Sequence, residues 1–353
     1  MIKSLHVLGY NKFFERFRIE SEFSICDVGR IISEHKARYI VMTERGEFEA
    51  EITGHMRFNA HCREEFPATG DWVSLSIDVS GVSNIHHIFP RLSAISRPSV
   101  GKFGAIQIIA TNIDYALIVQ AVDRDYNINR LERYLTICHS SNVKPIIVLT
   151  KIDLIDWVQV ANLVDGIKQR MKDIAIVAIS NATHDGYSSL WEIIEEGKTY
   201  CLLGSSGVGK STMLNNLSGR TIMKTDAISL STNKGRHVTS HRELIVLENG
   251  GLLIDNPGMR EIGVVDVVLG IEKTFSDIMD YSHACKFKDC THTVEHGCAV
   301  LEAVSKGNVD KNSYDNYLKL EREKSFFESS VQERRRKDKA FGKMIRHYKK
   351  NME

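Results

Sequence analysis

The sequence predicts an α/β protein in which a mainly parallel, doubly wound sheet lies between a small N-terminal β unit and a helical C-terminal region. Three observations support this prediction. Apolar and polar residues alternate with period two in short segments from about residue 34 to 90. Apolar runs then alternate with helical patterns as far as about residue 265. Beyond that point, helical patterns flank a cluster of cysteines.

The composition is that of an ordinary soluble protein. Its 353 residues are enough for two or three hydrophobic cores. Charged residues make up 26% and the formal net charge is +1, so any surface that attracts nucleic acid must be local. No apolar stretch reaches the ~20 residues that span a bilayer, and the start lacks the apolar core of a signal peptide. We therefore expect a cytoplasmic protein without a membrane segment, whose seven cysteines are poor candidates for disulfides.

The N-terminal β unit has the size of a five-stranded barrel. The segments ARYIVMTERGEFEAEITG, GDWVSLSID and NIHHIFP alternate between turns that contain Gly and Asp. An oligonucleotide-binding (OB) barrel at 34–92 fits this length, after an N-terminal extension at 1–33. A structural β domain without a ligand is the alternative. The polar stretch PRLSAISRPSVGK, broken by two prolines, predicts a linker, which we place at 93–112.

The central domain, expected at 113–265, alternates strands with helices. The expected strands are IDYALIVQAV, KPIIVLTK, DIAIVAIS, KTYCLLGS and GGLLIDNP, and helical patterns such as NINRLERYLTICHSSN and VQVANLVDGIKQRMK lie between several of them. This alternation predicts parallel strands with helices on both faces. Sheets of that kind bind ligands at the carboxyl ends of their strands.

One of these strands runs into a phosphate-binding loop. The pattern GxxxxGKS occupies 204–211, between an apolar strand and a helix, as the motif requires. Glycines let backbone N–H groups reach the β-phosphate, Lys210 can reach the β- and γ-phosphates, and Ser211 can bind Mg²⁺. The candidate residues are Gly204, Ser205, Ser206, Gly207, Val208, Gly209, Lys210, Ser211 and Thr212.

Another strand ends in the acidic loop of LLIDNPG, residues 252–258. Asp255 can hold Mg²⁺ through water, and the N–H of Gly258 can bind the γ-phosphate. Downstream of a phosphate loop, this tetrad predicts a segment that senses whether the γ-phosphate is present.

The tetrapeptide TKID at 150–153 indicates that the base is guanine. The Asp153 carboxylate can accept hydrogen bonds from N1–H and the exocyclic amine of guanine, a pattern that adenine lacks, and Lys151 can lie along the base. Thr150 stands where asparagine is commonest, and its hydroxyl makes fewer hydrogen bonds. The run AISNAT also follows a strand, so Ser180 and Asn181 can close over the base.

These motifs stand in a rotated order. The base motif and base loop precede the phosphate loop, whereas the switch-like segment TDAISLSTNKGRHVTSHREL and the Mg²⁺ loop follow it. A circular permutation explains this order, because elements that meet in space are unchanged by where the chain begins. The motif order, GSSGVGKS, DNPG, GRHVTSHREL and a barrel ending in GDWV resemble the circularly permuted GTPases of the ribosome small-subunit-dependent GTPase A family (RsgA, YjeQ or YloQ type).

The resemblance implies a fold, an activity and a partner. The expected fold is a circularly permuted P-loop GTPase domain with an N-terminal OB-fold barrel and a C-terminal zinc-binding helical domain at 266–353. The expected activity is hydrolysis of GTP to GDP with Mg²⁺. The resemblance further implies that the protein is a late maturation factor of the small ribosomal subunit. Such a factor binds this subunit and its rRNA and leaves after hydrolysis. A monomer is expected.

The resemblance also suggests the hydrolytic residues. Thr239 matches the second threonine of the family's HTT string and is expected to bind Mg²⁺, although Val238 departs from that string. Met259 follows the acidic loop where many GTPases have a glutamine that orients water, and a thioether cannot do so. His237 resembles the family's proposed catalytic histidine; a solvated loop histidine is the alternative.

The cysteine cluster ACKFKDCTHTVEHGCAV is a candidate zinc site. Three thiolates and an imidazole form a closed structural zinc set, although the spacing alone leaves unpaired cysteines equally open. The resemblance implies that the ligands are Cys285, Cys290, His292 and Cys298. His283 and His296 could compete and are expected at the surface instead.

The C-terminal tail combines a basic face with an apolar stripe. Over residues 331–350, Arg and Lys outnumber Asp and Glu by seven, and Phe341, Met344, Ile345 and Tyr348 fall at helical spacing. Contact with RNA phosphates is the natural use of such a face, and a solvated helix is the alternative.

Two other functions stay open on the sequence. One is a P-loop kinase or other ATP-dependent enzyme that acts on a small molecule, against which TKID and the Met259 loop argue. The other is a nucleotide-gated RNA-binding protein whose hydrolysis is incidental.

Overall fold

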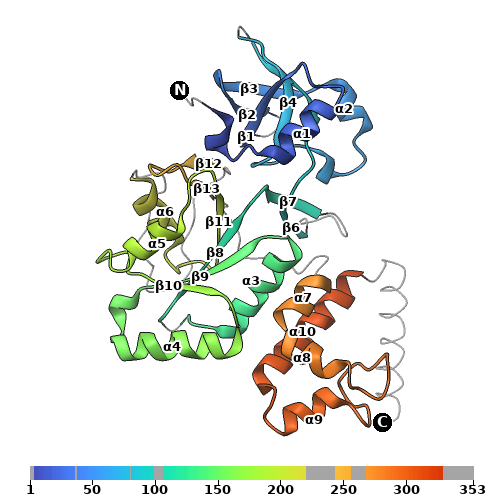
Figure 1. The fold of residues 1–353 in the computed structure, drawn as a ribbon, viewed down its shortest axis with the longest axis vertical. Helices are drawn as coiled ribbons and strands as arrows, with labels where there is room; N and C mark the ends of the chain where they lie inside the picture. The colour runs from blue at the N-terminus through green and yellow to red at the C-terminus, as the bar shows by residue number, and fades with distance from the viewer. Residues whose placement is uncertain are drawn as a thin grey trace, which may run out of the picture.

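The computed structural model describes residues 4–35, 38–79, 81–98, 106–123, 125–219, 243–255 and 268–328. A barrel, a central sheet and a group of helices follow one another along the long axis of the molecule (Figure 1). Some predictions concern residues outside the described ranges, namely His237, Val238, Thr239, Gly258, Met259 and the basic tail at 331–350.

The N-terminal part is a closed five-stranded barrel, as predicted. Its strands are β1 (Asp27–His35), β2 (Arg38–Thr43), β3 (Gly46–Ile52), β4 (Trp72–Ser76) and β5 (Ser83–Ile88). They pair in the order β1-β2-β3-β5-β4, and β4 pairs back with β1 to close the barrel. Apolar side chains such as Ile31, Val41 and Leu75 fill its interior. The helices of this part are η1 (Leu5–Leu8), α1 (Lys12–Glu20), α2 (Gly54–Asn59) and η2 (Arg63–Glu65).

Strand β1 begins at Asp27, inside the segment expected as an N-terminal extension. Six consecutive residues of this strand are buried, so it lacks the alternation that marked the other barrel strands. Ile31 packs inside the barrel, whereas Val28 and Ile32 belong to the cluster that also contains Phe14 of α1. Because β1 is covered on both faces, its sequence does not show a half-buried pattern.

The expected linker at 93–112 contains a two-stranded antiparallel sheet, β6 (Ala94–Pro98) and β7 (Ile106–Thr111). Ile95 pairs with Ala110, and both side chains are fully buried in the large central cluster. The buried side chains explain why β6 and β7 form in a segment with a polar, proline-containing sequence.

The central part is the predicted doubly wound sheet. Its strands run β10-β9-β8-β11-β13-β12, with the first five parallel and β12 antiparallel. The strands are β8 (Tyr115–Ala121), β9 (Lys144–Thr150), β10 (Ala175–Ala178), β11 (Thr199–Leu203), β12 (Glu243–Val246) and β13 (Leu252–Asp255). The helices are α3 (Ile128–Ser140), η3 (Ile152–Leu154), α4 (Trp157–Arg170), α5 (Tyr187–Ile193) and α6 (Lys210–Ser218).

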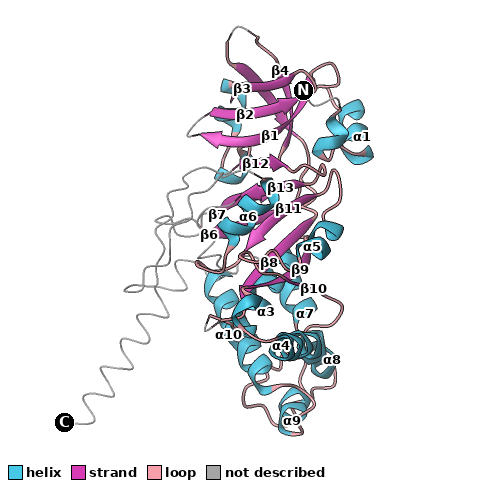
Figure 2. Cartoon of the chain, turned by 90° about the vertical axis from the view of Figure 1, so that its left-hand side faces the viewer, coloured by secondary structure: helices cyan, strands magenta, loops and turns pink. Residues whose placement is uncertain are grey.

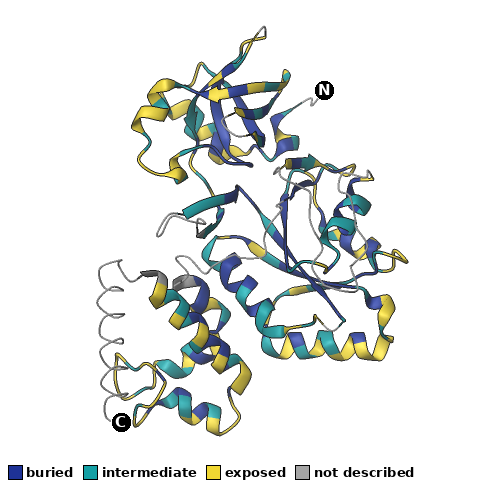
Figure 3. Cartoon of the chain, turned by 180° about the vertical axis from the view of Figure 1, so that it is seen from behind, coloured by how far each residue is buried: buried dark blue, intermediate teal, exposed yellow. Residues whose placement is uncertain are grey.

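Helices cover both faces of this sheet. Ala116 and Ile118 of β8 pack with residues of α3 and α4, whereas Leu117 and Val119 pack with residues of α5 and α6. Alternate side chains of one strand therefore reach opposite cores, which explains why the strands read as continuous apolar runs. Strands β8, β9, β11 and β13 are mostly buried, whereas α4 is mostly exposed (Figure 3).

The barrel is joined to the edge of the central sheet. Ser33 of β1 pairs with Glu243 of β12, so the strands of both parts form one series of eleven (Figure 2). Arg30 reinforces this junction from inside, because its fully buried guanidinium donates to Thr199 Oγ1 at 2.9 Å and to the Asn112 carbonyl at 3.0 Å. It also donates to the Gly70 carbonyl and stacks on Trp72, and burial lowers its pKa to about 10.

Within residues 268–328, the C-terminal part contains α7 (Val268–Thr274), α8 (Ser276–Ser282), α9 (Ala299–Ser305) and α10 (Lys311–Glu328). It docks on α3 through Glu132, a buried carboxylate that accepts from Arg170 at 2.6 Å, Ser313 at 2.8 Å and Asn316 at 2.6 Å. Arg133 of α3 pairs with Glu323 of α10 at 2.7 Å. Within the described ranges, none of the helices has the length and apolar character that crossing a bilayer would require.

Candidate functional site: a nucleotide site and a metal cluster

The phosphate loop lies between β11 and α6, at the carboxyl end of a central strand. Gly204 has φ +149°, and a Cβ there would lie 2.4 Å from the Val119 carbonyl oxygen. Gly209 has φ +94°, and its Cβ would lie 2.5 Å from the side-chain nitrogen of Asn181. Both glycines are therefore required by backbone conformation and by close approach of neighbouring strands and loops.

Lys210 is the first residue of α6, so the N-terminus of this nine-residue helix points at the loop. Its ammonium donates to the Gly204 carbonyl oxygen at 2.8 Å and to that of Ser205. Arg130 of α3 also reaches the loop, donating to Ser205 Oγ at 2.9 Å. The helix N-terminus, Lys210 and Arg130 together place N–H donors and positive charge at the phosphate loop, which suits an anion.

The base motif lies beside the phosphate loop. Thr150 is the last residue of β9, is fully buried, and donates through Oγ1 to the Val208 carbonyl at 2.6 Å. Lys151 adopts a left-handed conformation with φ +62°, and its ammonium pairs with Asp123 at 2.7 Å. The ion pair with Asp123, which follows β8, fixes the lysine stem along the edge of the site.

The loop at 180–183 orients the Asp153 carboxylate. The Ser180 hydroxyl donates to Asp153 Oδ1 at 2.6 Å and accepts from the N–H groups of Ala182 and Thr183 at 3.2 and 3.1 Å. One carboxylate oxygen is thus held by a buried hydroxyl, which limits the directions in which Asp153 can point. The structure brings the residues predicted for the base, Thr150, Lys151, Asp153, Ser180 and Asn181, to the same edge as the phosphate loop.

Asp255 ends β13, the strand directly beside β11, and is buried. It therefore lies at the same edge of the sheet as Lys210. The other residues predicted for the γ-phosphate and for hydrolysis, His237, Thr239 and Gly258, lie outside the described residues.

Several residues of this site were not predicted. Arg130 contacts Ser205 and Asp123 pairs with Lys151. Tyr187 holds the Asn181 side chain, and Asn216 donates to the main-chain carbonyl of Asn181. Arg130 and Asn216 lie on helices and read as ordinary polar positions, so only their proximity in space indicates a role. For Asp123, its place directly after an apolar strand was an available signal.

The cysteine cluster assembles as predicted. The ligand atoms of Cys285, Cys290, His292 and Cys298 all lie within 4.8 Å of one another. The sulfurs of Cys285 and Cys298 are 3.8 Å apart, and each is 3.5 Å from Nδ1 of His292. A tetrahedral zinc ion with bonds of about 2.0–2.3 Å places its ligands roughly 3.5–3.8 Å apart, which matches the separations among Cys285, His292 and Cys298. Cys290 completes a set of four ligands of the kind that zinc prefers. His283 and His296 are exposed and do not belong to the cluster.

The cluster is held by its surroundings. The Tyr314 hydroxyl of α10 donates to the His292 carbonyl at 2.6 Å, and Cys298 caps α9 by accepting from the Leu301 N–H. Glu295 accepts from the N–H groups of Thr291 and Thr293, both at 2.8 Å. The cluster therefore connects the loop at 285–298 to α9 and α10, as a structural metal site would.

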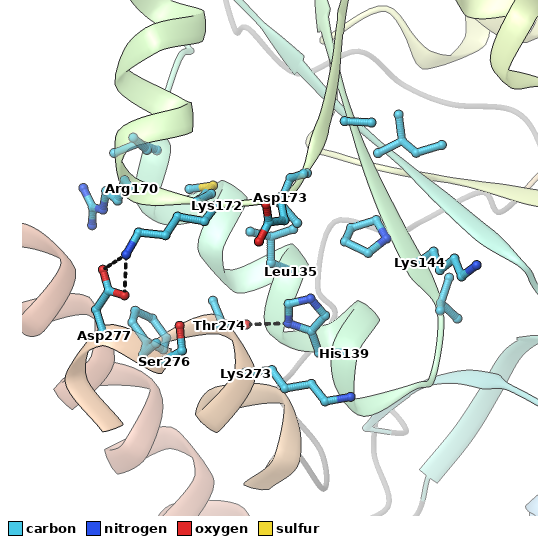
Figure 4. A pocket seen from close by; sticks show the side chains of 18 of the residues that line it. Leu135, His139, Lys144, Arg170, Lys172, Asp173, Lys273, Thr274, Ser276 and Asp277 are labelled. Atoms are coloured by element: carbon cyan, nitrogen blue, oxygen red, sulfur yellow. Dashed lines mark hydrogen bonds and ion pairs between the residues drawn. The ribbon is translucent and has the colours of Figure 1, made fainter. Parts of the chain in front are cut away.

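A cleft of about 1290 Å³ lies at the other end of the sheet. The first residues of three parallel strands, Tyr115, Lys144 and Ala175, line it, so it opens at the amino ends, away from the phosphate loop. Its far wall is α7 and α8 (Figure 4), which are held by His139 bonded to Thr274 at 3.1 Å and by Lys172 paired with Asp277 at 2.8 Å.

The fold and site define a GTP-hydrolysing enzyme of the P-loop class: the parallel sheet has a P-loop at its centre, a guanine-type base motif bonded to that loop, and a buried aspartate on the neighbouring strand. The motifs of this enzyme are circularly permuted. A family model described as RsgA GTPase matches residues 88–265. The chain belongs to the RsgA GTPase family.

Curated relatives match over almost the whole chain. Small ribosomal subunit biogenesis GTPase RsgA 1 of Bacteroides thetaiotaomicron is 37% identical over 348 residues, covering 98% of this chain and 97% of the relative. The protein of the same name from Listeria innocua is 39% identical and covers 91% of this chain and 90% of its own length.

Two solved structures share the fold. The crystal structure of YjeQ from Thermotoga maritima has a TM-score of 0.62 and 24% identity, covering 83% of this chain and 96% of its own. The structure of YloQ, described as a circularly permuted GTPase, has a TM-score of 0.61 and 25% identity, covering 87% and 97%. The fold and circular permutation predicted from the motif order are thereby confirmed.

Proposed function

We propose that this GTPase is a late maturation factor of the small ribosomal subunit, which it binds in the GTP form and leaves after hydrolysis. The curated relatives carry the name small ribosomal subunit biogenesis GTPase. The observation that supports the nucleotide chemistry is the hydrogen bond from Thr150 to Val208, because it joins the end of the strand before Lys151 and Asp153 to the phosphate loop. A ribosomal partner implies a cytoplasmic protein, which we propose acts as a monomer.

Each motif has a role in this proposal. The loop at 204–209 and Lys210 bind the phosphates, and Thr150, Lys151, Asp153, Ser180 and Asn181 position guanine. Ser211, Thr212, Thr239 and Asp255 surround Mg²⁺, and Gly258 senses the γ-phosphate. His237 orients the attacking water, because Met259 cannot. Arg130, Lys210 and the helix N-terminus supply positive charge where the phosphates carry negative charge.

The GTPase unit, the barrel and the C-terminal unit have different roles in this proposal. The GTPase unit spans about 113–265, the barrel offers a surface for rRNA, and the C-terminal unit is stabilised by one zinc ion at the Cys₃His cluster. The chain between Asp255 and α7 connects the γ-phosphate loop directly to the C-terminal part. Loss of the γ-phosphate can thus change how the C-terminal part is presented to RNA.

GTP turnover with and without purified small subunits tests this proposal. We expect turnover to rise at least tenfold with small subunits and to show no such rise with large subunits, which serve as the control. Cosedimentation should show retention with a non-hydrolysable GTP analogue and release with GDP. Competition by excess ATP for the bound guanine nucleotide, or equal retention in both nucleotide states, would contradict the proposal.

A further inference from the structure

The side chain of Asn181 bridges the base loop and the phosphate loop. Its Nδ2 donates to the Gly209 carbonyl oxygen at 3.0 Å. The approach is so close that a Cβ on residue 209 would lie 2.5 Å from this nitrogen. The contact is therefore a tight fit between two specific loops rather than a surface hydrogen bond.

Tyr187 fixes the orientation of this amide, and Asn216 holds the main chain of the same residue. The Tyr187 hydroxyl donates to Asn181 Oδ1 at 2.7 Å, so the amide nitrogen must face Gly209. Asn216, on the helix that begins at Lys210, donates to the Asn181 carbonyl at 3.2 Å and to the Tyr187 hydroxyl at 3.0 Å. The base loop is thus attached both to the phosphate loop and to the helix behind it.

This arrangement complements the threonine of the base motif. Thr150 stands where asparagine is commonest, and a hydroxyl has one donor whereas an amide has two. The hydroxyl of Thr150 donates its one hydrogen bond to the carbonyl of Val208, and Val208 directly precedes Gly209. Adjacent carbonyls of the phosphate loop are therefore bound by side chains from different strand ends.

We propose that the Asn181 side chain is a positioning residue for guanine nucleotide, supplying the second bond between base loop and phosphate loop that Thr150 cannot make. This inference rests on the nucleotide site proposed above. Asn181 acts through its neighbour Ser180, whose hydroxyl fixes Asp153. When the bridge is lost, the base loop moves more freely, and both Ser180 and Asp153 hold guanine less tightly.

The test measures release of fluorescent GDP and steady-state GTP hydrolysis by the full chain. In Asn181→Ala and in the isosteric Asn181→Asp, we expect the GDP dissociation rate and KM to rise about tenfold, the size expected for one lost hydrogen bond, with a much smaller change in kcat. Thr183→Ala is the matched control, because this hydroxyl of the same loop contacts Asp185 and not the phosphate loop. Its dissociation rate should stay within twofold of wild type.

Rescue provides the decisive result. Asparagine at position 150 has about the volume of threonine and restores the second donor, so Asn181→Ala should have almost no effect in a Thr150→Asn background. Additive effects of the two substitutions, or a wild-type dissociation rate in both Asn181 variants, would overturn the inference. If Asp153→Asn also leaves guanine binding unchanged, the nucleotide site itself is wrongly assigned; if Asp153→Asn weakens it, only the role of Asn181 is refuted.

Discussion

Thr150 and Val208 are joined by a hydrogen bond of 2.6 Å although they are 58 positions apart. Thr150 ends the strand that carries the base motif, and Val208 lies inside the phosphate loop. The bond shows that a rotated order of motifs leaves their spatial relation intact, because β9, β8 and β11 are neighbours in the sheet. The base and phosphate ends of one nucleotide can thus be bound by segments whose order in the chain is inverted.

We expect Asp153→Asn to change base specificity. An amide presents a donor to the amine of guanine, so affinity for GTP should fall about 100-fold with the loss of two charge-assisted hydrogen bonds. Xanthosine triphosphate has an oxygen in place of that amine and should bind better to the variant than GTP does. Competition for fluorescent GDP measures both affinities, and an unchanged ratio of the two nucleotides would argue against the assignment.

His237→Ala should separate binding from hydrolysis. If His237 orients the attacking water as proposed, its removal should lower turnover about 100-fold, while GDP affinity should stay within about twofold because the proposed role involves no contact with the nucleotide. Single-turnover hydrolysis and nucleotide titration measure the two quantities. Lys210→Ala serves for comparison, since it should weaken binding as well. Equal turnover in His237→Ala and wild type would remove the role.

One zinc ion per chain is expected at the cysteine cluster. Cys298→Ala removes one ligand and the cap of α9, so zinc should be lost during purification and the helices at 268–328 should unfold at lower temperature. Metal analysis and thermal unfolding test this, and Cys62→Ala, an exposed cysteine outside the cluster, is the matched control. Full zinc content in Cys298→Ala would show that the cluster is not the metal site.

Replacing Arg30 should destabilise the junction between barrel and sheet. Arg30→Met leaves the buried carbonyls of Gly70 and Asn112 without this donor, which costs about 3–5 kcal/mol in the free energy of unfolding. Arg38→Met, in an exposed ion pair with Glu49, should change stability little. Urea denaturation compares the variants, and similar midpoints for Arg30→Met and wild type would refute the role of the junction.

Acid should weaken the packing around the cleft. Burial, and secondarily Lys273, lower the pKa of His139 below its ordinary value of 6.5. As the pH falls through 6.5, the unfolded chain takes up the proton first, so stability decreases until the lower folded pKa is passed. The contribution of one histidine is at most about 1.4 kcal/mol per pH unit. Unfolding of His139→Asn at pH 7.5 and 5.5 should show a smaller loss than wild type, and equal losses would contradict this account.

Some features were predictable because they depend on local residue chemistry. The P-loop was predictable because its short segment requires glycine at 204 and 209 and a lysine after them. The doubly wound sheet was predictable because apolar strands alternate with helical patterns along the chain. The motif order also indicated the permutation. The Cys₃His set was predicted only with the family resemblance, because its spacing alone left two interpretations open.

Other features were decided by the tertiary structure. Strand β1 is buried on both faces, and Ile95 and Ala110 pair in two strands that lie within the expected linker. Likewise, the roles of Asn181 and Arg30 follow from hydrogen bonds to residues distant in sequence. The spacing of apolar residues indicates which face of a segment is buried. It does not indicate which carbonyl, distant in sequence, a given side chain will bind. That information arises only when the strands are assembled.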